Sequence, residues 1–232
     1  MPYSRDRRKR VVPLSDDESL LQKRKGLFFV FEGTDGAGTT TQCRLLGEML
    51  TGRGHQVICT REPGGTPIGE RIRELVLDSR HQEMFDHTEL LLYAAARAQH
   101  VKQKIRPALE AGKIVICDRF TASTIAYQSF ARGIDFSVTE NLNRLTAGKC
   151  IPDHTFYLRV SLTESRRRRV ERKGTVDRME GEGNDFQQKV IDGFEQIADQ
   201  DNRSRSILDA SQNQEALASC VLRDVLNCWP YL

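Results

Sequence analysis

A glycine-rich segment carries the first residues whose types and spacing point to chemistry. It reads GTDGAGTTT over residues 33–41, follows an apolar run and precedes apolar positions at helical spacing. The spacing is that of a P-loop, G-x-x-x-x-G-K-[S/T], in which backbone N–H groups converge on phosphate oxygens at the start of a helix. We therefore predict that this segment binds nucleotide phosphates. The expected contacts are Gly33, Thr34, Asp35, Gly36, Ala37, Gly38, Thr39, Thr40 and Thr41.

Thr39 occupies the position at which a P-loop has its lysine. The lysine ammonium neutralises charge on the β- and γ-phosphates during transfer, and a threonine side chain is too short and neutral to do so. Loss of one preorganised donor costs a factor on the order of 10²–10³ in rate. The sequence therefore predicts either a second cation in this role or a loop that supports little catalysis. Thr40 has the hydroxyl with which such a loop ligates Mg²⁺.

Five short apolar runs alternate with helix-length segments along the chain. They cover residues 27–32, 57–60, 114–118, 155–160 and 206–209. Strands separated by helices are typical of βαβ units, which place a parallel sheet between two helical layers. We expect a three-layer α/β domain whose ligands gather at the carboxyl ends of the strands. Three helices are predicted to be capped by polar residues followed three positions later by Glu or Gln, namely Asp86, Ser137 and Asn184.

The net charge of +3 is unevenly distributed. Residues 1–25 contain eight Lys or Arg and four Asp or Glu, so the rest of the chain has 27 basic and 28 acidic residues. Because the basic excess lies in this segment, no nucleic-acid-binding face is expected on the folded domain. We expect a flexible basic tail at 1–25, a domain at 26–228 and a short C-terminal tail at 229–232.

The spacing of the cysteines and the length of the apolar runs indicate the cellular compartment of the protein. The six cysteines are scattered without a CxxC pair, which favours a reducing compartment over a disulfide framework or a zinc site. The N-terminus has no apolar stretch of the secretory kind, and the longest apolar run is far too short to span a bilayer. We expect a cytoplasmic protein without membrane association.

Further motifs point to one family. Residues 60–70 read TREPGGTPIGE, and DRF at 118–120 ends the third apolar run. With the phosphate loop and the pair Asp177-Arg178, these motifs resemble the thymidylate (dTMP) kinase family, particularly its bacterial form. The resemblance extends from about residue 27 to about residue 226. It implies a P-loop nucleoside-monophosphate kinase fold with a five-stranded parallel sheet, and phosphorylation of dTMP by ATP with Mg²⁺.

The resemblance implies roles around the acceptor phosphate and the metal. Arg61 and Arg119 would hold the dTMP phosphate, a task that suits guanidinium groups because they bind phosphate bidentately and stay charged. Asp35 would accept the 3′-hydroxyl of the sugar. Asp118 would orient Mg²⁺ through water, beside the hydroxyl of Thr40.

The nucleoside would be read by four other residues. By similarity, the ring of Tyr93 stacks on thymine and Arg97, four positions later on the same helix face, reaches a base carbonyl. Thr124 stands where a side chain reads the base edge. Tyr127 stands where bulk disfavours a ribose 2′-hydroxyl.

An arginine-rich segment resembles the family's ATP lid, at about 166–183. It reads ESRRRRVERK over residues 164–173. Bacterial members supply a lid arginine to the transferring phosphate when the loop lacks one. We hypothesise that Arg166, Arg169 or Arg172 partly replaces the lysine lost at Thr39, with Arg166 and Arg169 on a shared helix face.

The sequence thus predicts an enzyme that phosphorylates dTMP to dTDP for dTTP biosynthesis, with Asp35, Arg61, Arg119, Arg166 and Arg169 as its catalytic residues. The family is usually homodimeric, which predicts a second copy of the chain as partner. One alternative is a catalytically weakened paralogue that binds nucleotides, favoured by Thr39 and by Arg159, where the family commonly has Asp. Another is a kinase of a different deoxynucleotide or of a deoxynucleoside, although two arginines favour a monophosphate acceptor.

Overall fold

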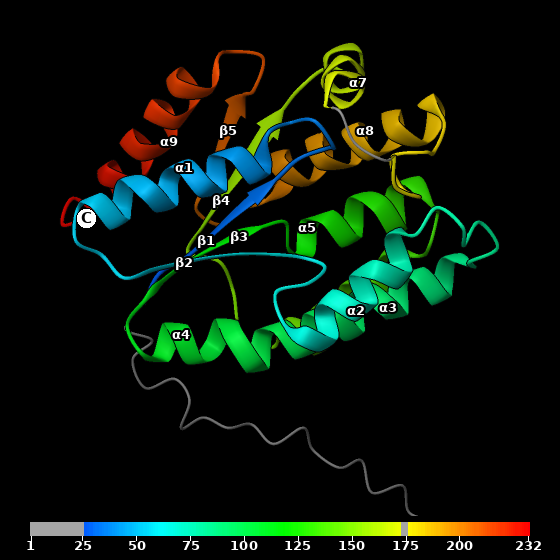
Figure 1. The fold of residues 1–232 in the computed structure, drawn as a ribbon, viewed down its shortest axis with the longest axis horizontal. Coiled ribbons are helices and arrows are strands. Elements are labelled where there is room, and N and C mark those ends of the chain that lie inside the picture. The colour runs from blue at the N-terminus through cyan, green and yellow to red at the C-terminus, as the bar shows by residue number, and fades with distance from the viewer. Residues whose placement is uncertain (1–25, 173–175) are drawn as a thin grey trace, which may run out of the picture.

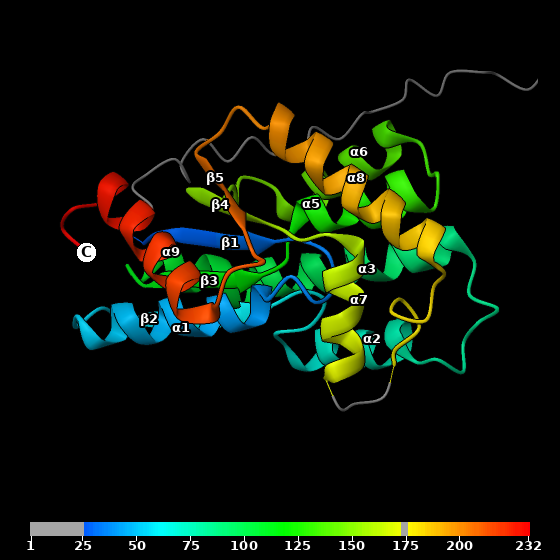
Figure 2. The same ribbon diagram turned by 90° about the horizontal axis from the view of Figure 1, so that it is seen from above.

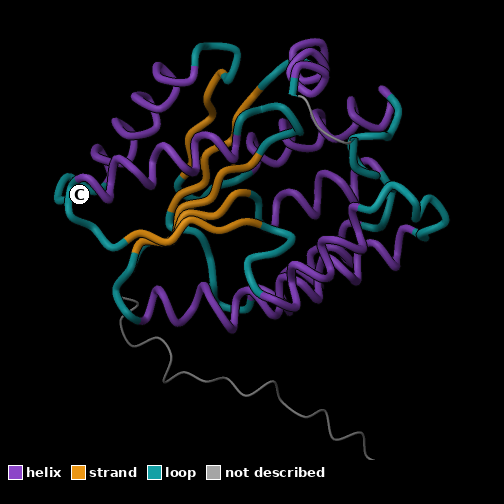
Figure 3. Tube along the Cα trace, viewed as in Figure 1, coloured by secondary structure: helices purple, strands orange, loops and turns teal. Residues whose placement is uncertain are grey.

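A five-stranded parallel sheet organises the molecule (Figures 1 and 3). The computed structural model describes residues 26–172 and 176–232. Across the sheet the strands run in the order β2 (Val57–Arg61), β3 (Ile114–Asp118), β1 (Phe28–Glu32), β4 (His154–Arg159) and β5 (Arg205–Asp209). All pairings are parallel. The five strands predicted from the apolar runs are therefore confirmed, each boundary within one residue.

The central strand β1 explains why its sequence is apolar without alternation, since both of its faces are buried. On one face Phe29 and Phe31 pack against helices α1 (Thr39–Gly52) and α9 (Gln214–Cys228). On the other face Phe28 and Val30 pack against the segment from residue 101 to 110. The sheet therefore lies between two helical layers, as predicted.

The second layer contains most of the remaining helices. A long helical stretch comprises α3 (Asp86–His100), the π-helical η2 (Val101–Ile105) and α4 (Arg106–Glu110). It is accompanied by α2 (Pro67–Leu77), α5 (Thr121–Thr124), the π-helical η3 (Ile125–Ala131), α6 (Phe136–Ala147) and α8 (Asn184–Gln200). Helix α7 (Leu162–Glu171) lies over the carboxyl end of β1, next to the loop that leads into α1 (Figure 2).

The three predicted helix caps were placed too late. Helix α3 is preceded by Phe85 as its cap, α6 by Asp135 and α8 by Gly183. Asp135 rather than Ser137 accepts the capping hydrogen bond, from the backbone N–H of Ser137. A Ser-x-x-Glu pattern is compatible with the first helical turn as well as with a cap, so the pattern located the helices but not their first residues.

Residues 229–232, expected as a tail, pack on the domain instead. Trp229 contacts Phe29 edge-on at 5.2 Å between ring centroids, and Leu232 is buried in the same core. The expected basic tail at 1–25 lies outside the described residues, as do 173–175 of the expected lid. No helix in the described part of the chain is both long and apolar enough to cross a membrane.

Candidate active site

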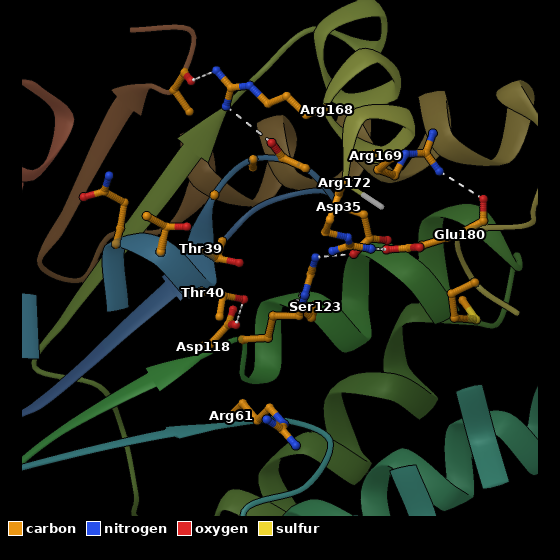
Figure 4. Close-up of a pocket in the computed structure, with 18 of the residues that line it drawn as sticks. Asp35, Thr39, Thr40, Arg61, Asp118, Ser123, Arg168, Arg169, Arg172 and Glu180 are labelled. Atoms are coloured by element: carbon orange, nitrogen blue, oxygen red, sulfur yellow. Dashed lines mark hydrogen bonds and ion pairs between the residues drawn. The ribbon is translucent and has the colours of Figure 1, made fainter. Parts of the chain in front are cut away.

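A cleft of about 1220 Å³ opens at the carboxyl ends of the strands (Figure 4). Its walls come from the loop before α1, the ends of β2 and β3, the helix pair α5–η3 and the lid helix α7. All seven residues predicted to bind the acceptor line it, namely Asp35, Arg61, Tyr93, Arg97, Arg119, Thr124 and Tyr127. The predicted metal ligands Thr40 and Asp118 also line it.

The phosphate loop has the backbone that its glycines predict. Gly36 and Gly38 have φ values of 80° and 94°, a region that L side chains rarely adopt, and α1 begins directly at Thr39. Residues from Asp35 to Thr41 line the cleft. Gly33 and Thr34, predicted as phosphate contacts, line a small separate cavity behind the loop instead. The N-terminus of α1 thus faces the cleft with its free N–H groups, a suitable site for an anion.

The residues at the predicted metal position are already in contact. The hydroxyl of Thr40 donates a hydrogen bond to Oδ2 of Asp118. Oδ1 of Asp118 is buried and has no hydrogen-bond partner among the described residues. Hydroxyl and carboxylate oxygens are ligands that Mg²⁺ prefers, and Mg²⁺ in kinases is held by one or two protein groups plus phosphates and water. The pair therefore fits a magnesium ion that completes its coordination with a nucleotide.

Asp35 and Arg119 form the centre of the acceptor side. Nη2 of Arg119 donates to Oδ1 of Asp35 at 2.7 Å, and the Tyr127 hydroxyl donates to Oδ2 at 2.9 Å. Burial raises the pKa of Tyr127 far above its usual value, so its hydroxyl stays a donor. Arg119 has a φ of 68° and is the only non-glycine residue with positive φ in the described segments. Such strain concentrates at functional sites, where surrounding contacts maintain it.

Glu32, which the sequence analysis did not select, supplies part of those contacts. Its carboxylate accepts hydrogen bonds from the backbone N–H groups of Phe120 and Ala122, at 2.9 and 3.1 Å, and from the Ser123 hydroxyl at 2.6 Å. Burial raises its pKa above the ordinary value of 4.5. Glu32 therefore holds the turn that aims Arg119 into the cleft. In the sequence, Glu32 is only the last residue of an apolar run, and nothing there indicates that its carboxylate holds a turn.

Arg61 and Arg73 form a second cationic group in the cleft. Arg61 is half exposed and pairs with Glu70 at 2.9 Å. Arg73, from α2, donates to the carbonyl of Pro63 at 3.0 Å and was not predicted. Burial and the nearby charge of Arg61 lower the pKa of Arg73. The signal for Arg73 in the sequence was its position on the helix that follows directly from the motif at 60–70.

Arg97 is held in a buried network. Its guanidinium donates to Glu62 at 2.7 Å, to Asn143, and to both the Phe120 carbonyl and the Thr124 hydroxyl at 2.9 Å. Four of its five N–H groups are thereby committed, and one on Nη1 has no partner among the described residues. Arg97 therefore has a single hydrogen bond to offer to a base carbonyl. Tyr93, one turn earlier on α3, lines the same cleft.

The lid arginines differ in direction. Arg168, Arg169 and Arg172 line the cleft (Figure 4), whereas Arg166 is exposed and lines a separate groove on the far side of α7. Of the three arginines predicted as candidates to replace the lysine, Arg169 and Arg172 line the cleft and Arg166 does not. Three positions along a helix leave a rotation of about 60°, which is enough to place one side chain outside the cleft edge.

The cleft-facing lid arginines contact the chain's own carbonyls and two acids, since Arg168 also pairs with Glu164 at 2.6 Å. Arg168 donates to Gly36 and Ala210 carbonyls at 3.4 and 2.7 Å. Arg172 pairs with the carboxylate of Glu180, and Arg169 donates to the Glu180 carbonyl at 3.0 Å. Nε of Arg169 is buried and unpartnered within the described residues.

Comparison with known proteins agrees with this geometry. Residues 31–221 match the family model described as thymidylate kinase. The chain belongs to the thymidylate kinase family. It is 45% identical over 201 residues to a thymidylate kinase of Exiguobacterium sibiricum, covering 87% of this chain and 94% of that protein. A thymidylate kinase of Pelotomaculum thermopropionicum is 46% identical over 200 residues, covering 86% and 92%.

A solved structure supports the same family placement. The crystal structure of thymidylate kinase from Ehrlichia chaffeensis superposes with a TM-score of 0.71 at 34% identity, covering 86% of this chain and 98% of that one. The fold is therefore the P-loop nucleoside-monophosphate kinase fold, as the resemblance implied.

Arg159 and Arg178 form ion pairs with residues of neighbouring helices. Arg159, where the family commonly has Asp, ends β4 at the surface and pairs with Asp199 of α8 at 2.9 Å. It lies outside the residues that line the cleft. Arg178 of the Asp177-Arg178 motif is buried and donates to the Val76 carbonyl at 2.9 Å and to Glu89 at 2.6 Å. Arg178 thus connects the C-terminal part of the expected lid to α2 and α3.

Proposed function

We propose that the protein transfers the γ-phosphoryl group of ATP to dTMP and releases ADP and dTDP. The observation that carries the proposal is that one cleft contains both a phosphate loop and the Asp35, Arg119 and Tyr127 group. Phosphoryl transfer needs positioning and charge neutralisation rather than a covalent intermediate. A site that holds donor and acceptor in line supplies the first of these.

The acceptor subsite is suited to a deoxynucleoside monophosphate. Arg61 and Arg119 provide charge for the monophosphate, and an uncharged nucleoside would leave these cations without a ligand. Oδ1 of Asp35 can accept from a sugar hydroxyl once Arg119 turns to phosphate, while Oδ2 keeps its hydrogen bond from Tyr127. Tyr127 fills the space beside Asp35 and disfavours a ribose 2′-hydroxyl, while Tyr93 and the remaining N–H of Arg97 would contact thymine.

Mg²⁺ is the proposed cofactor, held by Thr40 and Asp118. It would supply charge neutralisation between the β- and γ-phosphates of ATP. The orphaned Oδ1 of Asp118 supports this assignment, because a buried carboxylate oxygen without a partner is costly unless a cation or water binds it.

Arg169 and Arg172 are the proposed replacements for the missing lysine. Both line the cleft from the lid side, and the buried Nε of Arg169 makes no hydrogen bond among the described residues. Arg166 is not one of the proposed catalytic residues, because it lies outside the cleft. The weakened-paralogue alternative rests mainly on Thr39, since Arg159 is not among the residues that line the cleft and pairs with Asp199 instead.

The deciding experiment measures ADP release by the purified full-length protein with Mg-ATP. We expect strong stimulation by dTMP, weaker stimulation by dUMP and none by thymidine. Thr39→Lys serves as the comparison. If only Thr39→Lys is active, the wild-type protein is a nucleotide-binding paralogue and the proposal fails; a preference for another monophosphate would replace dTMP as the substrate.

A homodimer is the proposed assembly. Helix α3 packs between α2 and α6, and these three helices expose apolar side chains to solvent. They are Ile68, Leu75, Leu91, Phe136, Val138 and Leu145. Exposed apolar side chains on neighbouring helices favour an isologous contact between two copies of the chain. Light scattering should give twice the mass of 26.4 kDa, and Leu91→Glu should reduce it to one chain.

We also place the protein in the cytoplasm. All six cysteines are free thiols, three of them buried, which suits a reducing compartment. Fractionation of cells that express the full chain would test the placement, and recovery in an oxidising compartment would contradict it.

A further inference from the structure

A chain of four polar side chains lies at the amino ends of β4 and β5, away from the phosphate cleft. His154 begins β4, Ser204 lies in the loop before β5, Ser206 is in β5 and Asp224 is in α9. β4 and β5 pair side by side, with α9 next to β5 (Figure 2). The four side chains line a surface groove of about 660 Å³. None of them lines the nucleotide cleft.

The hydrogen bonds in this chain run in one direction. The Ser206 hydroxyl donates to Oδ2 of Asp224 at 2.7 Å, and this uses its only proton. At the Ser206 oxygen, 2.9 Å away, Nε2 of His154 must therefore be the donor. Nδ1 of the neutral ring then lacks a proton and accepts from the Ser204 hydroxyl at 2.7 Å. The direction is set by Asp224, because a carboxylate only accepts.

His154 is placed as a shielded base and Ser204 as an accessible hydroxyl. The imidazole is 3% exposed and packs against Phe156 and Trp229, with ring centroids 4.6 and 6.0 Å apart. Burial lowers its pKa below the ordinary 6.5, so the ring is neutral at pH 7. Ser204 is exposed in the groove. The nucleotide chemistry gives neither residue a role.

We propose that Ser204 is a base-assisted nucleophile that takes an acyl group from a small activated ester bound in this groove. A serine bonded to a base, with the base oriented by a third group, is the general arrangement of an activated hydroxyl. Here Ser206 and Asp224 orient and polarise the imidazole. Arg203 and Arg205 flank Ser204 in the groove wall.

The step conserves atoms and charge. The Ser204 oxygen forms a bond to the acyl carbon while its proton passes to Nδ1 of His154. The bond from the acyl carbon to the leaving oxygen breaks, and that oxygen takes the proton from His154 and departs as an alcohol. The product is an ester of Ser204, and no oxidant or further reactant takes part.

Ser137 provides an internal control in the same molecule. It is also exposed and its hydroxyl donates to a carboxylate, that of Asp135, but no imidazole among the described residues bonds to it. If exposure and a neighbouring carboxylate were enough for reactivity, the two serines would react alike. General-base assistance typically contributes about 10²–10⁴-fold in rate.

The experiment treats the full-length protein with p-nitrophenyl acetate, and separately with a fluorophosphonate, and maps modified serines by peptide mass spectrometry. We expect Ser204 to be modified at least about 10²-fold faster than Ser137. His154→Gln should remove most of this advantage and Asp224→Asn a smaller part. Kinase activity should stay unchanged in Ser204→Ala, because Ser204 lies outside the nucleotide cleft.

Two outcomes would overturn the proposal. One is a wild-type protein in which Ser204 reacts no faster than Ser137, a comparison that needs no variant and no assumption about folding. The other is a Ser204 rate that His154→Gln, shown by its kinase activity to be folded, leaves unchanged. In either case the four side chains would only satisfy the polar atoms of a buried histidine.

Discussion

The hydroxyl of Ser165 donates a 2.7 Å hydrogen bond to the backbone carbonyl of Asp35 and so joins the lid helix to the phosphate loop. Ser165 is fully buried, and its own carbonyl lies 2.7 Å from the point where a Cβ on Gly36 would stand. The helix that carries the lid arginines therefore rests directly on the loop that lacks a lysine. This contact sets how far those arginines are from the phosphate loop.

Ser165→Ala tests that relationship. Loss of the hydrogen bond should cost about 1 kcal/mol of stability. Because small misplacements of catalytic groups are amplified in rate, we expect kcat to fall on the order of 10-fold with little change in the dTMP KM. Steady-state kinetics and urea unfolding measure the two effects. Ser219→Ala is the matched control, since that hydroxyl also donates to a carbonyl, Glu215, but on the surface of α9. Equal kcat in both variants would argue against the coupling.

The lid arginines should differ sharply in turnover. Arg172→Met removes a cleft-facing cation and should lower kcat by a factor on the order of 10²–10³. Arg166→Met, at a position outside the cleft, should leave kcat within about twofold of the wild type. ADP release with saturating dTMP measures both. Similar losses of kcat in the two variants would mean that both substitutions disturb α7, and that removal of a particular cation is not the cause.

A lysine returned to the loop should compensate for a lost lid cation. We expect Thr39→Lys to raise the kcat of the Arg172→Met variant by more than it changes that of the wild type, because each cation would neutralise the same phosphate charge. A double-mutant cycle in kcat measures the coupling. Additive effects would separate the roles of residues 39 and 172.

Glu62 should matter for stability more than for chemistry. It is buried and accepts from Arg97 at 2.7 Å and contacts His100 at 3.0 Å. Breaking a buried ion pair leaves an uncompensated charge, so Glu62→Gln should destabilise the fold by about 3–5 kcal/mol. Glu48→Gln, which breaks the exposed pair with Arg44, should change stability by under about 1 kcal/mol. Urea midpoints compare them, and equal shifts would contradict the burial argument.

Glu32 should produce a specific dependence of stability on pH. Its pKa in the folded protein is raised above the ordinary 4.5 by burial, so its protonated form favours folding. Its contribution is therefore fully present below about pH 4.5 and is lost as the pH rises through the folded value. Relative to Glu32→Gln, the wild type should be more stable at pH 4.5 than at pH 8. Chemical unfolding at both pH values measures this, and a constant difference would show that Glu32 titrates alike in both states.

The sheet, the phosphate loop and the position of the acceptor cleft could be predicted from the amino-acid sequence. Strands buried on both faces must be continuously apolar, and parallel strands bring their carboxyl ends to one edge, so motifs far apart in the chain converge there. Asp35, Arg61 and Arg119 each lie at or just after the end of one of these strands, and the family resemblance implied their roles at the acceptor. The turn of the phosphate loop could also be predicted from its glycines, since a positive φ favours glycine.

The folded structure was needed to show which way individual side chains point and which polar groups act through others. Arg166 and Arg172 belong to one arginine-rich run, yet packing of α7 on the loop leaves only one of them in the cleft. Glu32, Ser165 and Arg73 are ordinary residues in sequence, and their importance arises from partners such as Phe120 and Asp35 that are distant along the chain. A hydrogen bond needs distance and direction between two atoms, and a linear pattern supplies neither until the chain has folded.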